Sequence, residues 1–174
     1  MDPEFTTNIK PISTPKFMKD TLNMLHARAK EQLLLYGEVQ SVILGLNPQE
    51  GKIHEYNVTS LMNSPENREV VRMMMEEAIS QDHIALIFLV TEAWLVKLKM
   101  KKITKDEALT IRPSEHPDRE EVVLITIMTK TEQFIASAKI HRDPVSLDEF
   151  EVVSLTDTGE GTLVRNKEDT PSVH

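Results

Sequence analysis

The chain has 174 residues, with 20 Lys and Arg against 28 Asp and Glu, which gives a formal charge of −8. This length suits one domain of ordinary size that buries its own core. The chain contains no Cys, which excludes disulfides, thiolate zinc sites and thiol nucleophiles, and which fits a cytoplasmic protein. The acidic balance argues against a protein whose whole surface binds nucleic acid.

Neither a membrane segment nor a nucleotide-binding loop is predicted. The longest apolar run, Ile84–Val90, is far shorter than the roughly 20 residues that span a bilayer. The N-terminus lacks the positive start and apolar core of a signal peptide. No P-loop and no GxGxxG pattern occurs. We therefore expect no membrane partner and no cofactor.

The two ends of the chain are predicted to lie outside the folded domain. Residues 1–7 read MDPEFTT and resemble translated cloning sites, so they are left out of the fold prediction. Residues 157–174 have no apolar periodicity, contain Gly159 and Gly161, and are predicted to form a flexible C-terminal tail. A single domain is therefore expected over residues 8–156.

The first helix is marked at both ends. Thr14 is the predicted N-cap, Pro15 takes the first helical position, and Gly37 is the predicted stop. Between them, apolar residues recur every three or four positions, which is the period of one helical face. These residues are Met18, Leu22, Leu25, Ala29, Leu33 and Tyr36.

A hairpin and a second helix are predicted next. Glu38–Leu46 and Lys52–Thr59 are strand-like segments separated by a cluster of turn-forming residues. Ser64 as N-cap and Pro65 after it begin the second helix, which ends near Gln81. Its predicted buried stripe consists of Val71, Met74, Met75, Ala78 and Ile79.

Four more strands complete the predicted domain. His83–Met100 is the long central strand, Glu121–Lys130 and Gln133–Arg142 form a hairpin, and Phe150–Leu155 is the last strand. Most connections are too short for a crossover helix, so neighbouring strands should be antiparallel. The predicted fold is α+β in the order α-β-β-α-β-β-β-β. It has a single mainly antiparallel sheet of five to six strands, with two helices on one face.

Glu92 stands out in the central strand because its face is otherwise apolar. Side chains alternate between the two faces of a strand, so Glu92 shares a face with Val90 and Trp94. An isolated buried carboxylate is costly and needs a partner, a proton or water. Three interpretations are open: a bulge that turns Glu92 to solvent, a structural ion pair or hydrogen bond, and a functional acid or metal ligand.

Charged residues crowd the segment Arg112–Glu121, which leads into the next strand. Antiparallel pairing of that strand with the central strand brings the segment near the end of the central strand. Arg119 or Arg112 is the expected bidentate partner of Glu92. The candidate site residues are Glu92, Trp94, Arg112, Glu115, His116, Asp118, Arg119 and Glu121.

The same two segments resemble a known signature. Glu92-Ala93-Trp94 ends a strand, and after a polar loop the chain continues as Pro113-Ser114-Glu115-His116-Pro117-Asp118-Arg119-Glu120-Glu121. This resembles a group of uncharacterised bacterial proteins in which a strand ending in Glu-Ala-Trp precedes a Pro-Ser-x-x-Pro-Asp-Arg-x-Glu segment. The resemblance implies a bacterial protein in which Glu92 and Arg119 are linked, and it implies no reaction.

Two functional alternatives rest on charged groups. The carboxylates of Glu92, Asp118 and Glu121 and the imidazole of His116 suit a divalent metal and hence a metal-dependent hydrolase. No diagnostic ligand spacing is present, so no metal ligand is assigned. A row of lysines suits contact with an anion or with nucleic acid, but it lacks interleaved aromatic residues for base stacking. The row consists of Lys97, Lys99, Lys101, Lys102 and Lys105.

The apolar pattern favours a third function. The long central strand and the methionine-bearing second helix present more apolar surface than two helices readily cover. We therefore expect a non-catalytic interaction or structural module that acts as a homodimer. The metal-dependent hydrolase and the nucleic-acid accessory protein are the alternatives.

Overall fold

The computed structural model describes residues 16–98, 113–154 and 161–166. These residues contain two α-helices, α1 (Lys16–Tyr36) and α2 (Pro65–Ser80), and two 3-10 helices, η2 (Thr59–Leu61) and η3 (Pro113–Glu115). The strands are β1 (Val42–Asn47), β2 (Lys52–Asn57), β3 (Leu86–Leu98), β4 (Glu120–Met128), β5 (Gln133–Arg142), β6 (Val145–Leu147), β7 (Glu151–Ser154) and β8 (Gly161–Asn166).

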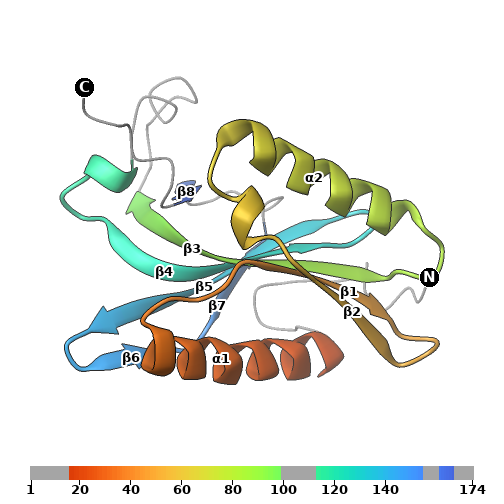
Figure 1. The fold of residues 1–174 in the computed structure, drawn as a ribbon, viewed down its shortest axis with the longest axis horizontal. Coiled ribbons are helices and arrows are strands. Elements are labelled where there is room, and N and C mark those ends of the chain that lie inside the picture. Colours follow the sequence, from red (N-terminus) through yellow and green to blue (C-terminus); the bar gives the residue numbers. More distant parts are fainter. Residues whose placement is uncertain (1–15, 99–112, 155–160, 167–174) are drawn as a thin grey trace.

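All eight strands belong to one curled sheet (Figure 1). The main order is β2-β1-β3-β4-β5-β6, while β7 pairs with β5 and β8 pairs with β3. Every strand pair in the described residues is antiparallel. The predicted α+β class and the predicted single antiparallel sheet are therefore confirmed.

The two helices cover opposite faces of the sheet, as Figure 1 shows with α1 below and α2 above. The core beneath α1 includes Leu44 of β1 and Phe88 of β3. The core beneath α2 includes their chain neighbours Ile43 and Ile87, whose side chains point the other way. The prediction of two helices on one face is wrong, because β3 is apolar on both faces and each face needs a cover.

Helix α2 begins where the sequence predicts. The Ser64 hydroxyl oxygen accepts the Asn67 N–H at 3.2 Å, and Pro65 follows the cap. Of the predicted stripe, Val71 and Met75 are buried, but Met74 is 37% exposed and lies at the margin of the contact. Neither helix in the described residues is long and apolar enough to cross a lipid bilayer.

Strands β6 and β8 are absent from the sequence prediction. β6 has three residues, which is too short for a period-two pattern to be recognised. β8 lies in the segment 157–174, where a flexible tail is predicted. It pairs with β3, with Ala93 opposite Asn166 at one end of the ladder and Leu98 opposite Gly161 at the other. Residues 161–166 therefore belong to the sheet, and the rest of this segment lies outside the described residues. Residues 1–7 and the predicted cap Thr14 also lie outside them.

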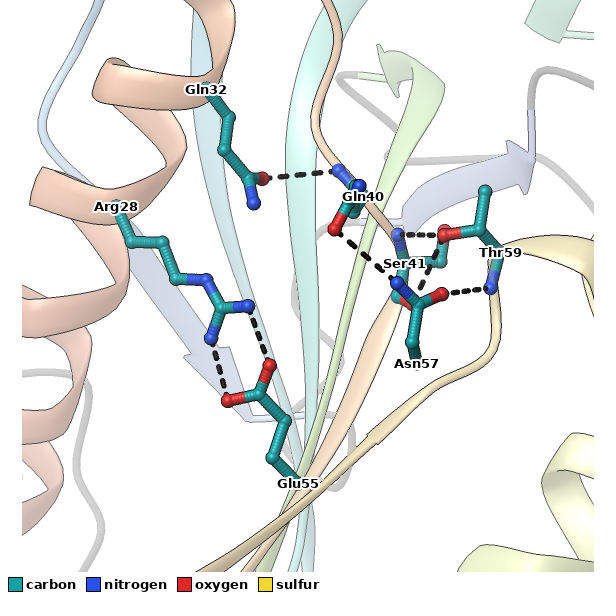
Figure 2. A network of polar contacts seen from close by, with 7 residues as sticks. All are labelled: Arg28, Gln32, Gln40, Ser41, Glu55, Asn57 and Thr59. Atoms are coloured by element: carbon teal, nitrogen blue, oxygen red, sulfur yellow. Dashed lines mark hydrogen bonds and ion pairs between the residues drawn. The ribbon is translucent and has the colours of Figure 1, made fainter.

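Polar contacts tie α1 to the β1–β2 hairpin (Figure 2). Arg28 donates to both carboxylate oxygens of Glu55, at 2.8 and 2.5 Å. Gln40 N–H, just before β1, donates to Gln32 Oε1 of α1 at 3.1 Å. These contacts hold β2 beside one flank of α1. Among the described residues, β1 is the one strand that pairs with β2.

The pair between Arg28 and Glu55 generates a pH prediction. Its hydrogen bonds hold the pKa of the Glu55 carboxyl below the usual value, because they favour the ionised form. A lowered folded-state pKa stabilises the protein above the unfolded-state pKa, and this contribution is lost as the pH falls through the folded value. Glu55→Gln should lower the free energy of unfolding by on the order of 0.5 kcal/mol at neutral pH.

Urea unfolding at pH 7 and in strong acid checks this expectation. The difference between wild type and Glu55→Gln should shrink towards zero in acid, where Glu55 is protonated in both states. Glu38→Gln is the matched control, since Glu38 is an exposed carboxylate just before the same hairpin. An equal difference at both pH values would contradict an ionic contribution.

Candidate functional site

Glu92 lies where β3 exchanges one neighbouring strand for another. Along one edge, β3 pairs with β1 as far as Val90 and with β8 from Ala93 onward. Along its other edge, the ladder with β4 runs without interruption from Ile87 to Leu95. There is therefore no bulge at Glu92, and its side chain is 11% exposed. The interpretation in which Glu92 turns to solvent is wrong.

The Glu92 carboxylate contacts a backbone N–H and an arginine. The Val39 N–H donates to Glu92 Oε1 at 2.8 Å, and Arg142 Nη2 lies 3.8 Å from the same oxygen. Val39 is buried and precedes β1, beyond the last pair of the β1–β3 ladder. The Glu92 carboxylate thus supplies an acceptor to a buried N–H that has no strand partner. This geometry agrees with the structural interpretation of Glu92.

Arg142, the last residue of β5, joins several elements. Its Nε and Nη2 donate to the two carboxylate oxygens of Glu121 at 3.0 and 2.5 Å, and its Nη1 donates to the Gly37 carbonyl oxygen at 2.5 Å. The hydrogen bond to Glu121 raises the pKa of Arg142 above its usual value, so the guanidinium stays charged. Arg142 thereby links the end of α1 to β3, β4 and β5.

Arg142, rather than Arg119, is an arginine that lies beside Glu92 in the described residues. The Arg119 guanidinium instead lies over the Trp94 ring, 5.0 Å from its centre, in a cation–π contact. Arg112 lies outside the described residues. The sequence prediction missed Arg142 because it considered the segment next along the chain, whereas the pairing of β3, β4 and β5 brings the end of β5 to Glu92.

The four predicted metal ligands do not form one group: Glu92 and Glu121 both lie beside Arg142, apart from His116 and Asp118. Glu121 lies opposite Trp94 in the β3–β4 ladder, and its carboxylate is paired with Arg142. His116 Nδ1 accepts the Asp118 N–H at 3.1 Å, which is a local turn contact. Within residues 16–98, 113–154 and 161–166, no three His, Asp or Glu side chains form a group suited to a metal ion. The hydrolase alternative stays a prediction with no metal ligand assigned.

The predicted anion site falls mostly outside the described residues. Of the lysine row, Lys97 is part of β3. Glu115, which was predicted as a member of the Glu92 site, belongs to η3. The other members of the lysine row lie in the segment 99–112, outside the described residues. A contact between this row and an anion stays a prediction.

The open edge of the sheet at β2 forms a different candidate surface. β2 is the first strand in the sheet order, and all six of its residues are exposed. Tyr56 is 57% exposed on the α2 face of the sheet, and Ile53 is 45% exposed on the α1 face. His54 is also exposed. The sequence shows this strand but not that its second edge is unpaired.

Exposed apolar side chains also line β2 on both helices. Met24 and Leu35 share a flank of α1 with Arg28, the residue that contacts β2, and they are 43% and 65% exposed. On the other face, Val70 and Met74 share a flank of α2 and are 46% and 37% exposed. Each helix therefore carries large exposed apolar side chains on the flank from which Arg28 or Met74 reaches β2.

Comparisons with known proteins assign no family to this chain. No family model, no curated protein and no solved structure matches it. The resemblance to the group with the Glu-Ala-Trp signature therefore stays a prediction.

Removal of the Glu92 carboxylate should destabilise the fold. Glu92→Ala leaves the buried Val39 N–H without its acceptor and removes a charge beside Arg142, so the free energy of unfolding should fall by about 2–4 kcal/mol. Glu92→Gln keeps an acceptor oxygen and should lose less than half of that amount. Urea unfolding measures both variants. An unchanged unfolding curve for Glu92→Ala would contradict the structural role.

Proposed function

We propose that this protein is a non-catalytic interaction module that acts as a cytoplasmic homodimer, with β2 at the centre of the dimer interface. The observation behind this proposal is that β2 is a six-residue edge strand, exposed along its whole length, with an exposed apolar side chain on each face (Ile53 and Tyr56). Edge strands with unpaired backbone groups are ready templates for pairing with another strand. The absence of Cys supports the cytoplasmic location.

The two edges of the sheet differ in a way that supports this proposal. At the edge formed by β5 and its partners, β6 has three residues and β7 has four. Short strands are one of the means by which proteins blunt an edge against pairing. β2 is longer, and its backbone has one neighbouring strand in the described residues. The β2 edge is therefore the one suited to an intermolecular strand pair.

The charges on β2 do not oppose a second strand. Lys52 Nζ lies 3.1 Å from Glu50, and Glu55 is paired with Arg28. Charged side chains protect an edge best when they have no partner within the chain, because they then repel an incoming strand. Here both charges are balanced within the chain, which leaves the backbone and the apolar side chains to dominate the edge.

A second copy of the chain is the occupant that this edge suits. Two identical strands can pair antiparallel about a two-fold axis, and such an isologous contact closes without leading to a filament. Residues of the same face then stand opposite each other. With His54 on the axis, Lys52 faces Tyr56 of the second copy and Ile53 faces Glu55. With Glu55 on the axis, two carboxylates would oppose each other, so we favour the register centred on His54.

A charge placed at the centre of β2 should separate the dimer. Ile53→Glu introduces a carboxylate directly opposite Glu55 of the second copy, so we expect light scattering at micromolar concentration to change from the mass of two chains to that of one. Ile53 is 45% exposed, so the substitution should leave the monomer folded. Circular dichroism checks that point.

Val153→Glu is the matched control. Val153 is 44% exposed and lies on β7 at the opposite edge of the sheet. This variant should remain a dimer. A wild-type protein that is monomeric at micromolar concentration, or a Val153→Glu variant that dissociates as readily as Ile53→Glu, would overturn the proposed interface.

A further inference from the structure

His54 lies at the middle of the open edge strand β2. It is exposed, and its side chain is on the α2 face of the sheet, beside Gly45 of β1. The imidazole makes no hydrogen bond or ion pair with any described residue. Histidine is the side chain that ordinarily changes its charge between about pH 8 and pH 5. The open edge therefore carries a titratable group at its centre that is free to meet a second strand.

The proposed dimer brings two copies of this histidine together. With His54 on the two-fold axis, each imidazole faces the imidazole of the second copy, and Cβ atoms directly opposite in an antiparallel pair are about 5 Å apart. Two neutral imidazoles are compatible there, because each ring has one hydrogen-bond donor and one acceptor. Two imidazolium ions are not, since both rings are then donors only and both are positive. Lys52 of the second copy, the diagonal neighbour on the same face, adds to the repulsion.

The other ionisable groups beside His54 act within one chain. The groove between α2 and β2 is lined by His54 together with Tyr56, His83 and the acidic Glu77. Glu77 makes no ion pair with His54 in the described residues, and its field acts on His54 in the monomer and in the dimer alike. Glu55 lies on the α1 face, where Arg28 binds it. The second copy therefore adds mainly positive groups to the surroundings of a protonated His54.

We propose that pH regulates the dimer through His54: neutral imidazoles allow the two β2 strands to pair, and their protonation separates the copies. This inference rests on the proposed homodimer and on its register. The monomer binds these protons more readily than the dimer, so by linkage a falling pH favours the monomer. The overall charge acts in the opposite direction, because the net charge of −8 becomes smaller as carboxylates gain protons. A dimer that weakens on acidification therefore points to a local group.

The dissociation constant of the full chain at about pH 8 and about pH 6 tests this regulation, because carboxylates stay ionised over that range while histidines titrate. Sedimentation velocity over a dilution series measures it, with EDTA present so that no divalent metal bridges the imidazoles. The dimer should be about fivefold weaker at the lower pH. A dimer of equal affinity at both pH values would overturn the regulation alone, whereas a monomer at both would overturn the proposed function as well.

Two variants of His54 separate its charge from its size. His54→Gln stays neutral and keeps a hydrogen-bonding side chain, so its dimer affinity should be independent of pH. His54→Lys is positive throughout, so at the higher pH it should dissociate at least as readily as the wild type does at the lower pH. Because His54 is exposed, both substitutions should leave the monomer folded, which circular dichroism checks.

His83→Gln is the matched control for these variants. His83 is exposed and lines the same groove, but it precedes β3 and does not belong to the strand that pairs. This variant should keep the pH dependence of the wild type. A pH dependence that survives in His54→Gln, or that is lost equally in His83→Gln, would overturn the assignment to His54.

Discussion

The need to cover both faces of β3 determines the arrangement of the rest of the fold. Leu86 and Phe88 lie in the core beneath α1, and Ile87 lies in the core beneath α2. β3 is also paired along both edges, with β4 on one side and with β1 and then β8 on the other. A strand buried in this way needs a layer on each side, and this requirement separates the two helices.

The cluster around Arg142 follows from the length of β3. Because β1 leaves the ladder before β8 begins, the buried backbone of Val39 has no strand acceptor at that point. Glu92 supplies one, and Arg142 balances the charge while binding Glu121 and the end of α1. An unusual carboxylate in an apolar face is explained here by strand pairing and helix docking. The surface open to a partner lies around β2.

Local signals predicted the elements well. Ser64 and Pro65 mark the start of α2, and the apolar period of α1 identifies its buried residues except Tyr36, which is 71% exposed at the end of the helix. The long strands were also recognised from their apolar and β-branched residues. β6 has only three residues, which is too few for a recognisable pattern, and β8 was missed because its segment contains Gly159 and Gly161 and has no apolar periodicity. The candidate site was predicted in part: Glu92 and Glu121 do meet, but through Arg142 instead of Arg119.

The sequence by itself determined the class of the fold, the main elements and the presence of one carboxylate that needs a partner. These depend on local spacing, capping and polarity, which act between residues close in the chain. Only the tertiary structure decided which face each helix covers, which arginine reaches Glu92, which strand is left at the edge, and where a groove opens. Those features depend on strand order, and strand order arises from contacts between residues far apart in the chain.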